Sequence, residues 1–566
     1  MPDARDIRSH LETLVRQAVA AAVAAGDLPD VAVHGAAIER PKDASNGDFA
    51  STLPLRLARA AMKPPIEIAQ VIARHLPDDL SIERPQVAPP GFLNIRLSTA
   101  FVQQQVEQVI TLGERYANLS LGSGRKAQVE FVSANPTGPL HVGNGRGAAI
   151  GDALASALQA AGYEVEREYY VNDAGTQTDT FSDTLYARYQ QQFGREVEIP
   201  KDGYPGKYMV ELASEIKGQA GDSFLQPLGD PTPPDLGTLG VELMIRHIRR
   251  TLEAFGVRYD CWFSERSLYD PGGPSEAAMG LLRGKGALVE REGALWFASS
   301  ELGEEKDNVV VRSDGRPTYY ASDVAYHWDK FIRRGFNLVV DVWGADHHGH
   351  VSRLKTAAGA IGADPESLQV LLYQLVTLKR GGEIVRLSKR GGEIITLDEL
   401  IEEVGKDAAR FFFLLRSPGA QMEFDLDLAV KQSNENPVFY VQYAHARLAG
   451  ILQRAREQGI EADGGDVSLL TQPHELGLVR EMMRLTDVIE TVATTFEPQH
   501  LPHYAMSLAN EFTAFNDAYK QANDSSLKVI TDDVALTKAR LRLVLAAKIA
   551  LARVLGIMGM AAPERM

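Results

Sequence analysis

Residues 128–152, QVEFVSANPTGPLHVGNGRGAAIGD, decide the fold of this chain. Residues 129–132 are mostly β-branched or aromatic and predict a strand, and a Pro/Gly turn follows at 135–139. The small residues after the turn predict a helix over about 142–161 that ends at Gly162, and YEVEREYYV then predicts another strand. A strand, a tight turn and a helix are the first half of a phosphate-binding βαβ unit.

The start of this predicted helix offers free backbone N–H groups and the positive end of the helix dipole. His141 lies at that start, where an imidazole can donate a hydrogen bond to a phosphate oxygen. Gly143, Gly145 and Gly147 are expected to let a nucleotide approach the backbone closely. The stretch therefore predicts a nucleotide site.

Length and composition are those of a multidomain globular protein. The chain has 566 residues, with 45% apolar and 24% charged residues, which suits about three to five domains. Its single cysteine, Cys261, excludes an internal disulfide framework and a multi-cysteine zinc site and suits a reducing cytosol. No run has the length of a membrane span, and LVRQAVAAAVAA near the N-terminus is interpreted as an amphipathic helix rather than a signal peptide.

The net charge of −16 argues against a generic nucleic-acid binder, but a whole-chain sum can hide a local basic surface. The segment 534–563 has no Asp or Glu and carries a basic series, which consists of Lys538, Arg540, Arg542, Lys548 and Arg553. This series is either a solvated helix face or part of an RNA-binding surface. The charge leaves RNA binding open.

The pattern along the chain divides it into three parts. Residues 1–118 mix helical patterns with short strands, and residues 119–405 alternate strands and helices around a Pro/Gly-rich surface insertion at about 199–240. Residues 406–566 read as wholly helical, without a strand. The predicted fold is multidomain α/β, with a Rossmann-like nucleotide-binding domain between an N-terminal α+β domain and a C-terminal all-α bundle.

A second candidate site lies in TYYASDVAYHWDK, residues 318–330. Tyr319 and Asp323 are four residues apart and therefore share a face if this segment is a helix. A Tyr–Asp pair on a helix face is commonly structural, so the alternatives are a structural pair and a substrate contact.

Histidines gather in DVWGADHHGH, residues 341–350, after the short apolar strand NLVV. His347, His348 and His350 suggest a metal site, and His347 and His350 could share a helix face. No cysteine lies near and the number of carboxylates is ordinary, so we expect no zinc.

The third candidate is EIVRLSKRGGEIITLDEL, residues 383–400. Thr396 and Glu399 form a capping box for the next helix, so residues 386–392 must be the loop before it. This loop is either a glycine-rich hairpin with solvated basic side chains or a cationic loop that meets phosphates.

SANPTGPLHVGNGRGAAIGD closely resembles the ATP-binding signature of class I aminoacyl-tRNA synthetases, specifically of the arginyl-tRNA synthetase family. The family's usual His-x-Gly-His here ends in Asn144, which can donate to a phosphate or ribose oxygen but carries no positive charge. RLSKR resembles the second class I signature, usually Lys-Met-Ser-Lys-Ser or -Arg: Arg386 replaces its first lysine, while Ser388 and Lys389 stand in place. Two signatures in this order are specific together.

The resemblance implies a role for each of these positions. His141, Asn144 and Lys389 would be catalytic, stabilising the negative charge that develops on the phosphates. ATP would be bound by Ser133, Pro136, His141, Gly143, Asn144, Arg386, Ser388 and Lys389. Arginine would be held by Glu130, Asn135, Tyr319, Asp323 and His347, although Asp346 is an equal candidate to His347. Carboxylates suit the guanidinium group because it presents donors in a rigid fork.

The remaining parts of the chain resemble the same family. KDAARFFFLLRSP at 406–418 and the C-terminal LGIMGMAAPERM resemble its helical anticodon-binding domain. The turn-like GDFAS at 47–51 and PGFLNIRL, with its strand-like part at 91–97, resemble its tRNA-contacting N-terminal domain. In NENPVFYVQYAHAR the aromatic residues, which serve either base stacking or core packing, are Phe439, Tyr440 and Tyr443.

The implied activity is ATP-dependent formation of arginyl-adenylate, followed by transfer of the arginyl group to the terminal ribose of tRNA(Arg), with Mg²⁺ on the ATP phosphates. The expected protein is a cytoplasmic monomer without a membrane contact. One alternative is a cysteinyl-type synthetase or an adenylyltransferase on the same fold, and a single cysteine disfavours the cysteine-rich zinc pocket of the former. The other is a non-catalytic RNA-binding relative, which the presence of His141 and Lys389 disfavours.

Overall fold

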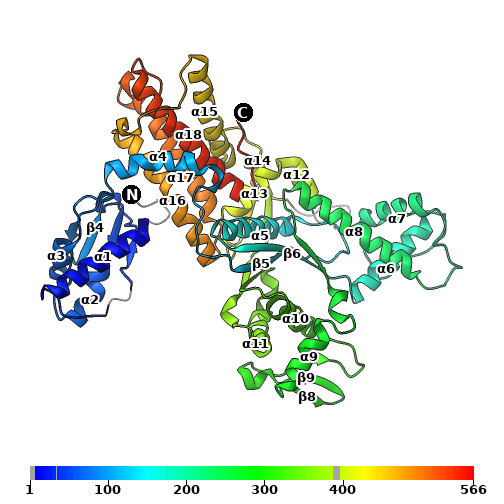
Figure 1. Ribbon diagram of the computed structural model, residues 1–566. Helices are drawn as coiled ribbons and strands as arrows, with labels where there is room; N and C mark the ends of the chain where they lie inside the picture. Colours follow the sequence, from blue (N-terminus) through cyan, green and yellow to red (C-terminus); the bar gives the residue numbers. More distant parts are fainter. Residues whose placement is uncertain (1–6, 33–34, 175, 386–394) are drawn as a thin grey trace.

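The computed structural model describes residues 7–32, 35–174, 176–385 and 395–566. A sheet and its covering helices lie at the centre of the molecule, and further parts extend from it in several directions (Figure 1). The predicted site residues Arg386, Ser388 and Lys389 fall outside the described residues.

The central sheet has five strands, all parallel, in the order β12–β11–β5–β6–β7. Their bounds are β5 (Lys126–Phe131), β6 (Glu164–Val171), β7 (Cys261–Ser264), β11 (Leu338–Gly344) and β12 (Leu368–Tyr373). The chain runs outward in one direction from β5 and then returns to the other side through β11, so the topological switch point lies between these two strands. Doubly wound α/β sheets bind ligands at the carboxyl ends of the strands at this point. The predicted Rossmann-like fold is confirmed.

Helices cover both faces of the sheet. The predicted helix after β5 is α5 (Val142–Ala160), which covers one face, and α10 (Tyr319–Trp328) and α11 (Val351–Ile361) lie on the other (Figure 1). Gly151 makes the packing of α5 close, because a Cβ there would lie 2.2 Å from the ring of Phe131. The chain turns after α5 at Gly162, whose φ is +92°, as predicted for the residue that stops this helix.

Two segments interrupt the sheet connections. Between β6 and β7 a helical lobe projects outward, at the right of Figure 1, and it contains α6 (Thr176–Gln191), α7 (Lys207–Ala220) and α8 (Pro234–Ala254). The predicted insertion at 199–240 thus holds α7 and the start of α8. Between β7 and β11 lie α9 (Pro274–Gly284) and an antiparallel sheet of β8 (Leu288–Arg291), β9 (Ala294–Phe297) and β10 (Asn308–Val311).

The N-terminal part is an antiparallel sheet with helices. Its strands are β1 (Ile38–Glu39), β2 (Phe49–Ser51), β4 (Phe92–Ile95) and β3 (Gln86–Ala88), and its helices are α1 (Ile7–Ala24), α2 (Leu53–Ala61) and α3 (Pro65–His75). The predicted strand near residue 91 is β4. The GDFAS turn was predicted too long: only its beginning turns, with Gly47 at φ +97°, and the rest pairs with β4 as β2.

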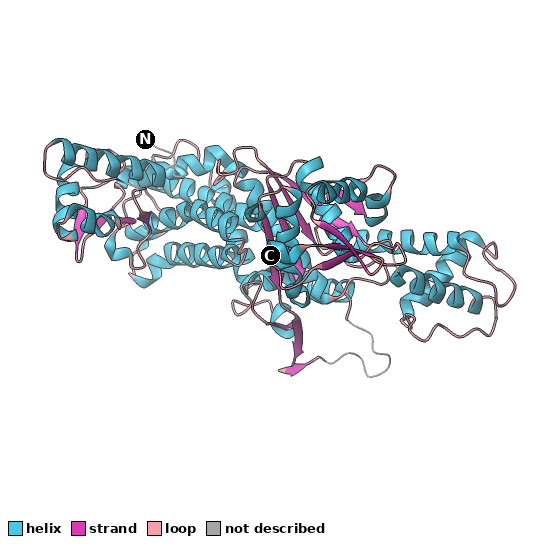
Figure 2. Ribbon diagram, turned by 90° about the horizontal axis from the view of Figure 1, so that it is seen from below, coloured by secondary structure: helices cyan, strands magenta, loops and turns pink. Residues whose placement is uncertain are grey.

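The C-terminal part is mostly helical, with α12 (Leu397–Val404), α13 (Lys406–Leu414), α14 (Leu426–Ala429), α15 (Pro437–Glu457), α16 (Pro473–Thr495), α17 (His500–Gln521) and α18 (Val534–Ile557). The expectation of no strand beyond residue 405 is wrong. β15 (Met422–Asp425) pairs in parallel with β13 (Val376–Arg380), and β14 (Glu383–Ile384) pairs antiparallel with β13. Four residues are too short for a clear period, and the pairing partner is distant in sequence. In Figure 2 strands appear in the middle of the molecule and also near its left end, with helices around them.

A buried arginine joins this C-terminal part to α5. The guanidinium of Arg410 on α13 lies 2.5 Å from a carboxylate oxygen of Asp152 on α5. It also donates to the backbone carbonyls of Met558 at 2.7 Å and Phe255 at 3.2 Å. Arg410 is fully buried, so these partners replace its water.

The basic series on α18 is part of the packing. Arg540 is 1% exposed and donates to Glu475 on α16 at 2.7 Å. Arg542 pairs with Glu107 on α4 (Thr99–Leu112), a helix from the N-terminal part of the chain. Both interpretations offered for these two residues, a solvated face and an RNA-binding surface, are therefore wrong, because their charges are neutralised within the protein.

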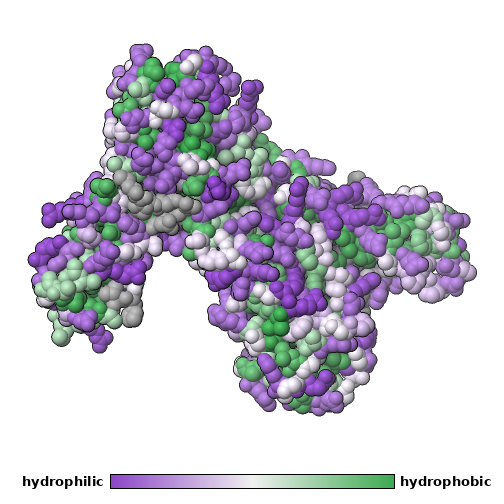
Figure 3. Space-filling model, viewed as in Figure 1, coloured by the Kyte–Doolittle hydropathy of each residue, from purple (hydrophilic) through white to green (hydrophobic). Residues whose placement is uncertain are grey.

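The face of the molecule seen in Figure 3 is largely hydrophilic, with apolar residues in separate areas. Among the residues that the structure describes, no helix combines the length and the apolar character needed to cross a bilayer.

Candidate active site

The start of α5 is closed by two reciprocal hydrogen bonds. His141 is the N-cap, and its Nδ1 accepts from the backbone N–H of Asn144 at 3.3 Å. The Asn144 Oδ1 accepts from the backbone N–H of His141 at 3.0 Å. The residue that departs from the usual signature therefore completes a capping box, which fixes the His141 ring at the helix N-terminus.

The cap also determines which nitrogen of His141 faces outward. Because Nδ1 accepts a hydrogen bond, the neutral ring carries its hydrogen on Nε2. Desolvation by neighbouring protein atoms lowers the pKa of His141, which favours this neutral form. The exposed ring thus presents an N–H donor beside the free N–H groups of the helix.

The glycines of the signature have different roles from those expected. A Cβ at Gly143 would lie 2.9 Å from the His141 ring, so this glycine makes room for the cap. A Cβ at Gly145 would lie 2.6 Å from Leu397, and one at Gly147 would lie 2.8 Å from the hydroxyl of Tyr373. Gly145 and Gly147 therefore allow close packing against protein, and their predicted approach to a nucleotide is wrong.

The segment after the second signature returns to this helix start. Val142 N–H donates to the carbonyl of Ile395 at 3.3 Å, and Leu397 N–H donates to the carbonyl of Leu140 at 2.8 Å. The predicted capping box of Thr396 with Glu399 is present at the start of α12. The segment that follows the second signature therefore lies beside the first signature, where His141 and Thr396 form a bridge.

The end of β5 has an unusual backbone. Val132 at φ 69° and Ser133 at φ 40° are consecutive left-handed residues, a conformation that is costly for a β-branched side chain. The hydroxyl of Ser133 donates to Glu130 Oε1 at 2.9 Å and accepts from the backbone N–H of Tyr170 at 3.1 Å. These bonds hold the strained corner at the carboxyl edge of the sheet.

The next predicted residues follow this corner directly. The Asn135 amide donates to Gln177 Oε1 at 2.5 Å, and Pro136 is buried. Both lie at the switch point, between β5 and the start of α5, where the fold places a ligand.

Glu130 is a paired carboxylate. Its Oε2 lies 2.7 Å from Nζ of Lys330, and its Oε1 accepts from Ser133. Burial raises the pKa of Glu130, and the ammonium of Lys330 opposes that rise. Lys330 was missed in the sequence, because one lysine between aromatic residues of a helical pattern gives no sign that it is buried.

Asp323 on α10 is an acid whose carboxylate no described lysine or arginine pairs with. Within the described residues no hydrogen bond reaches its carboxylate, and it lies near the carboxylates of Glu130, Asp341 and Glu265. Burial first, and then these like charges, raise the pKa of Asp323 to about 7, although His327 opposes the rise. Such a group favours binding of a cation, which would stabilise its charged form.

Glu265 is a second buried acid, and it was not predicted. It begins the turn after β7, where its carboxylate accepts from the Ser322 hydroxyl at 3.0 Å and from the Asn172 amide at 2.7 Å. Burial raises the pKa of Glu265. Its position directly after a strand of the central sheet was the only signal in the sequence.

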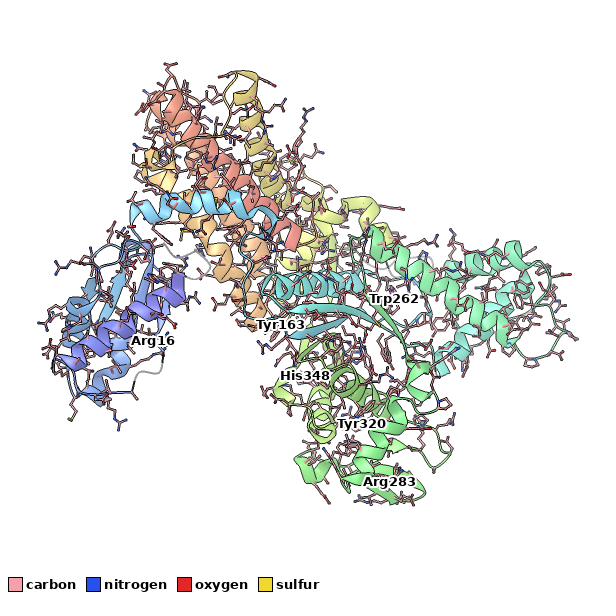
Figure 4. The ribbon with its side chains drawn as sticks, in the orientation of Figure 1. Arg16, Tyr163, Trp262, Arg283, Tyr320 and His348 are labelled. Carbon is pink, nitrogen blue, oxygen red and sulfur yellow. The ribbon has the colours of Figure 1, made fainter. Side chains whose placement is uncertain are left out.

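The remaining predicted residues are exposed. Tyr319 begins α10 and is 59% exposed, whereas its neighbour Tyr320 is buried and donates to the carbonyl of Arg353 at 3.0 Å. His347 follows β11. Its ring lies 3.4 Å from the carboxylate of Asp346, and both side chains are exposed. The helix predicted for Tyr319 and Asp323 is confirmed. Figure 4 shows Tyr320 and His348 on the side of the sheet opposite α5.

One group among the described residues has the spacing of metal ligands. It consists of Glu166, Glu168 and Cys261, whose ligand atoms lie within 4.8 Å of one another. The guanidinium of Arg334 already pairs with both carboxylates, and burial raises the pKa of the Cys261 thiol to about 12. The group is an ion-pair cluster with an inert thiol.

Comparison with known proteins identifies the three parts of the chain. Residues 105–413 match the catalytic domain of class I tRNA synthetases (R), residues 9–97 match the arginyl-tRNA synthetase N-terminal domain, and residues 441–566 match the DALR anticodon binding domain. An arginine–tRNA ligase of Dehalococcoides mccartyi is 51% identical over 97% of both chains. One of Carboxydothermus hydrogenoformans is 47% identical over 96% of this chain and 97% of its own.

A solved structure agrees with the fold. The arginyl-tRNA synthetase of Thermus thermophilus superposes with a TM-score of 0.75 at 24% identity, covering 99% of this chain and all of its own. Because the matched domains and the relatives extend over almost the whole sequence, the chain belongs to the arginyl-tRNA synthetase family and has its class I catalytic domain.

Proposed function

We propose that this enzyme activates L-arginine with ATP and transfers the arginyl group to the 3′-terminal ribose of tRNA(Arg). The observation that supports arginine as the substrate is Asp323, a half-buried carboxylate at the carboxyl edge of the sheet with no hydrogen-bond partner among the described residues. The family supports the reaction. The carboxylate of arginine attacks the α-phosphorus of ATP and pyrophosphate leaves. A ribose hydroxyl, the 2′ in class I enzymes, then attacks the carbonyl and AMP leaves.

The arginine side chain would be recognised by acids on one side of the sheet. A guanidinium offers five donors, and Asp323 and Glu265 present carboxylate oxygens from two different elements. Glu130 adds negative charge from β5 while its own oxygens are bound. Asn135, Tyr319 and His347 complete the proposed set at the rim.

ATP would bind at the capped start of α5. The N–H of His141 and the helix N-terminus are oriented for phosphate oxygens, and Mg²⁺ would arrive with ATP. Catalysis is then mainly positioning and electrostatic stabilisation of the phosphates. The proposed ATP contacts are Ser133, Pro136, Gly143 and Asn144 near this helix start, together with Arg386, Ser388 and Lys389 from the second signature.

The N-terminal and C-terminal parts would hold tRNA. Phe439 and Tyr443 on α15 stack with ring centroids 5.9 Å apart and planes at 7°, and Tyr443 is 43% exposed. Such a pair can receive an unstacked base. We further propose domain boundaries at residues 118 and 405, a monomeric state, a cytoplasmic location and no bound zinc. The matched catalytic domain extends to residue 413, and α13 packs on α5 through Arg410.

The test is amino-acid-dependent exchange of ATP with pyrophosphate, measured for each of the twenty amino acids with and without tRNA. We expect exchange with arginine above all others. Exchange with another amino acid alone, or none under any condition, would show that the proposed substrate is wrong.

The dependence of arginine use on pH should follow Asp323. Below pH 7 the free enzyme holds this carboxyl protonated and neutral, since its pKa is raised to about 7. A neutral acid binds a guanidinium poorly, so kcat/KM for arginine should fall about tenfold per unit as pH decreases below 7 and should be level above it. Profiles of kcat/KM for arginine between about pH 5.5 and 9 test this. A profile that stays level down to pH 5.5 would contradict it.

A further inference from the structure

Three buried carboxylates form a row across the central sheet. Asp341 on β11 is the register partner of Glu130 on β5, and Glu130 is the partner of Glu168 on β6. Partners in a parallel register point to the same face. All three are buried, so this acidic row, Asp341–Glu130–Glu168, needs cations close by.

The cations come from the turn that follows α10. Lys330 Nζ lies 2.7 Å from Glu130 Oε2 and 2.8 Å from Asp341 Oδ1, and it is fully buried. The turn, Asp329–Arg333, is a π-helix, a rare form that is frequent at functional sites. Lys330 therefore binds both acids on the two strands that flank the switch point. It lies in the turn that directly follows α10, the helix that carries Asp323.

His327 is a second partner of the same pair. Its Nε2 lies 2.9 Å from Asp341 Oδ2, and its Nδ1 lies 2.8 Å from the backbone carbonyl of Asp323. Each nitrogen thus faces an acceptor. Lys330 and His327 together contact Glu130 and Asp341, while the carboxylate of Asp323 has no hydrogen-bond partner among the described residues.

We propose that Lys330 is a positioning residue for arginine recognition, which keeps Glu130 ionised and fixes α10 so that the charge of Asp323 is directed at the substrate. This rests on the proposed function. The ammonium bridges the strand and the helix on which the arginine pocket is built. The pKa of Asp323 depends on the charges around it. The groups that face it are Glu130, Asp341, Glu265 and His327, and its other titratable neighbours are Tyr170, Tyr269 and Tyr320.

The experiment replaces Lys330 by methionine, which keeps the chain length and removes the charge. Without the ammonium, the carboxyls of the pocket repel one another more strongly, so they lose their protons at a higher pH than in the parent. The acid limb is the pH range over which kcat/KM for arginine falls as the pH decreases. We expect it to shift to higher pH by about one unit or more, the size of effect that a charge within 4–6 Å has on a pKa. KM for ATP should stay near that of the parent.

Two further variants separate charge from structure. Lys330→Met combined with Asp341→Asn has the net charge of the parent, and such neutral replacements of buried pairs commonly fold. Its limb should return toward the parent position. Arg334→Met is the matched control. Arg334 directly follows the same π-helical turn, but its guanidinium pairs with Glu168. It should lower the unfolding temperature and leave the limb in place.

The outcomes are distinct. A limb that stays at the parent pH in folded Lys330→Met overturns the positioning role, as does an equal shift in the charge-balanced double variant or in Arg334→Met. If Lys330→Met does not fold, the double variant decides by the position of its limb. A parent without arginine-dependent exchange would instead refute the proposed function.

Discussion

Asp323→Asn is expected to lower kcat/KM for arginine by about a hundredfold or more. The substitution keeps the shape of the side chain and removes its charge, so the guanidinium loses its charged partner. Truncating one member of a buried charged pair costs ~2–5 kcal/mol, and about 2.7 kcal/mol corresponds to a hundredfold. The measurement is arginine-dependent exchange or charging at pH 8, where Asp323, with a pKa raised to about 7, is ionised in the parent.

Two controls accompany this variant. KM for ATP should be nearly unchanged, because the proposed nucleotide site is at α5, across the sheet from α10. Asp323→Asn should also discriminate less sharply between arginine and its neutral isostere citrulline. If Asp323→Asn and Glu130→Gln both leave KM for arginine within about twofold of the parent, the pocket lies elsewhere.

His141→Ala should lower the rate of adenylate formation by about a hundred- to a thousandfold, the range for removing one transition-state donor. The imidazole Nε2–H is the group at stake, because Nδ1 is committed to the helix cap. Single-turnover formation of arginyl-adenylate with bound tRNA gives the rate. KM for arginine should change little.

His141→Asn separates the two roles of this residue. Asparagine is a good N-cap, so this variant should keep the thermal stability that His141→Ala loses, about 0.5–2 kcal/mol. Its adenylation rate should be as low as that of the alanine variant. A rate near the parent's would mean that the imidazole does not contact the reacting phosphates.

The sequence was sufficient to predict those elements that are determined by interactions between residues close together in the chain. The strand–turn–helix of residues 128–152 became β5 and α5, because the period, the cap and the terminal glycine agree. The capping box at Thr396 was readable from four residues. The helix with Tyr319 and Asp323 on it was also predicted correctly.

The rest depends on contacts between distant residues. Gly145 resembles a nucleotide-binding glycine in sequence, and only the packing of Leu397 shows its actual role. Lys330 and Glu265 carry no motif, and they gain significance from strands far away in the chain. β15 is too short to show a period, so its strand form comes from β13. Sequence patterns therefore could not predict which single polar residues are buried or which residues they pair with.

The bond from Arg410 to Asp152 has a consequence for the order in which the protein is made. Asp152 lies on the first helix of the nucleotide domain, while Arg410 and the carbonyl of Met558 that holds it are far later in the chain. During synthesis, Asp152 can pair early with Arg167 on β6, which lies 3.0 Å away. The second, buried bond from Arg410, with its anchor at Met558, forms only when nearly the whole polypeptide has left the ribosome. The contacts of α5 are thus completed late, although its sequence is read early.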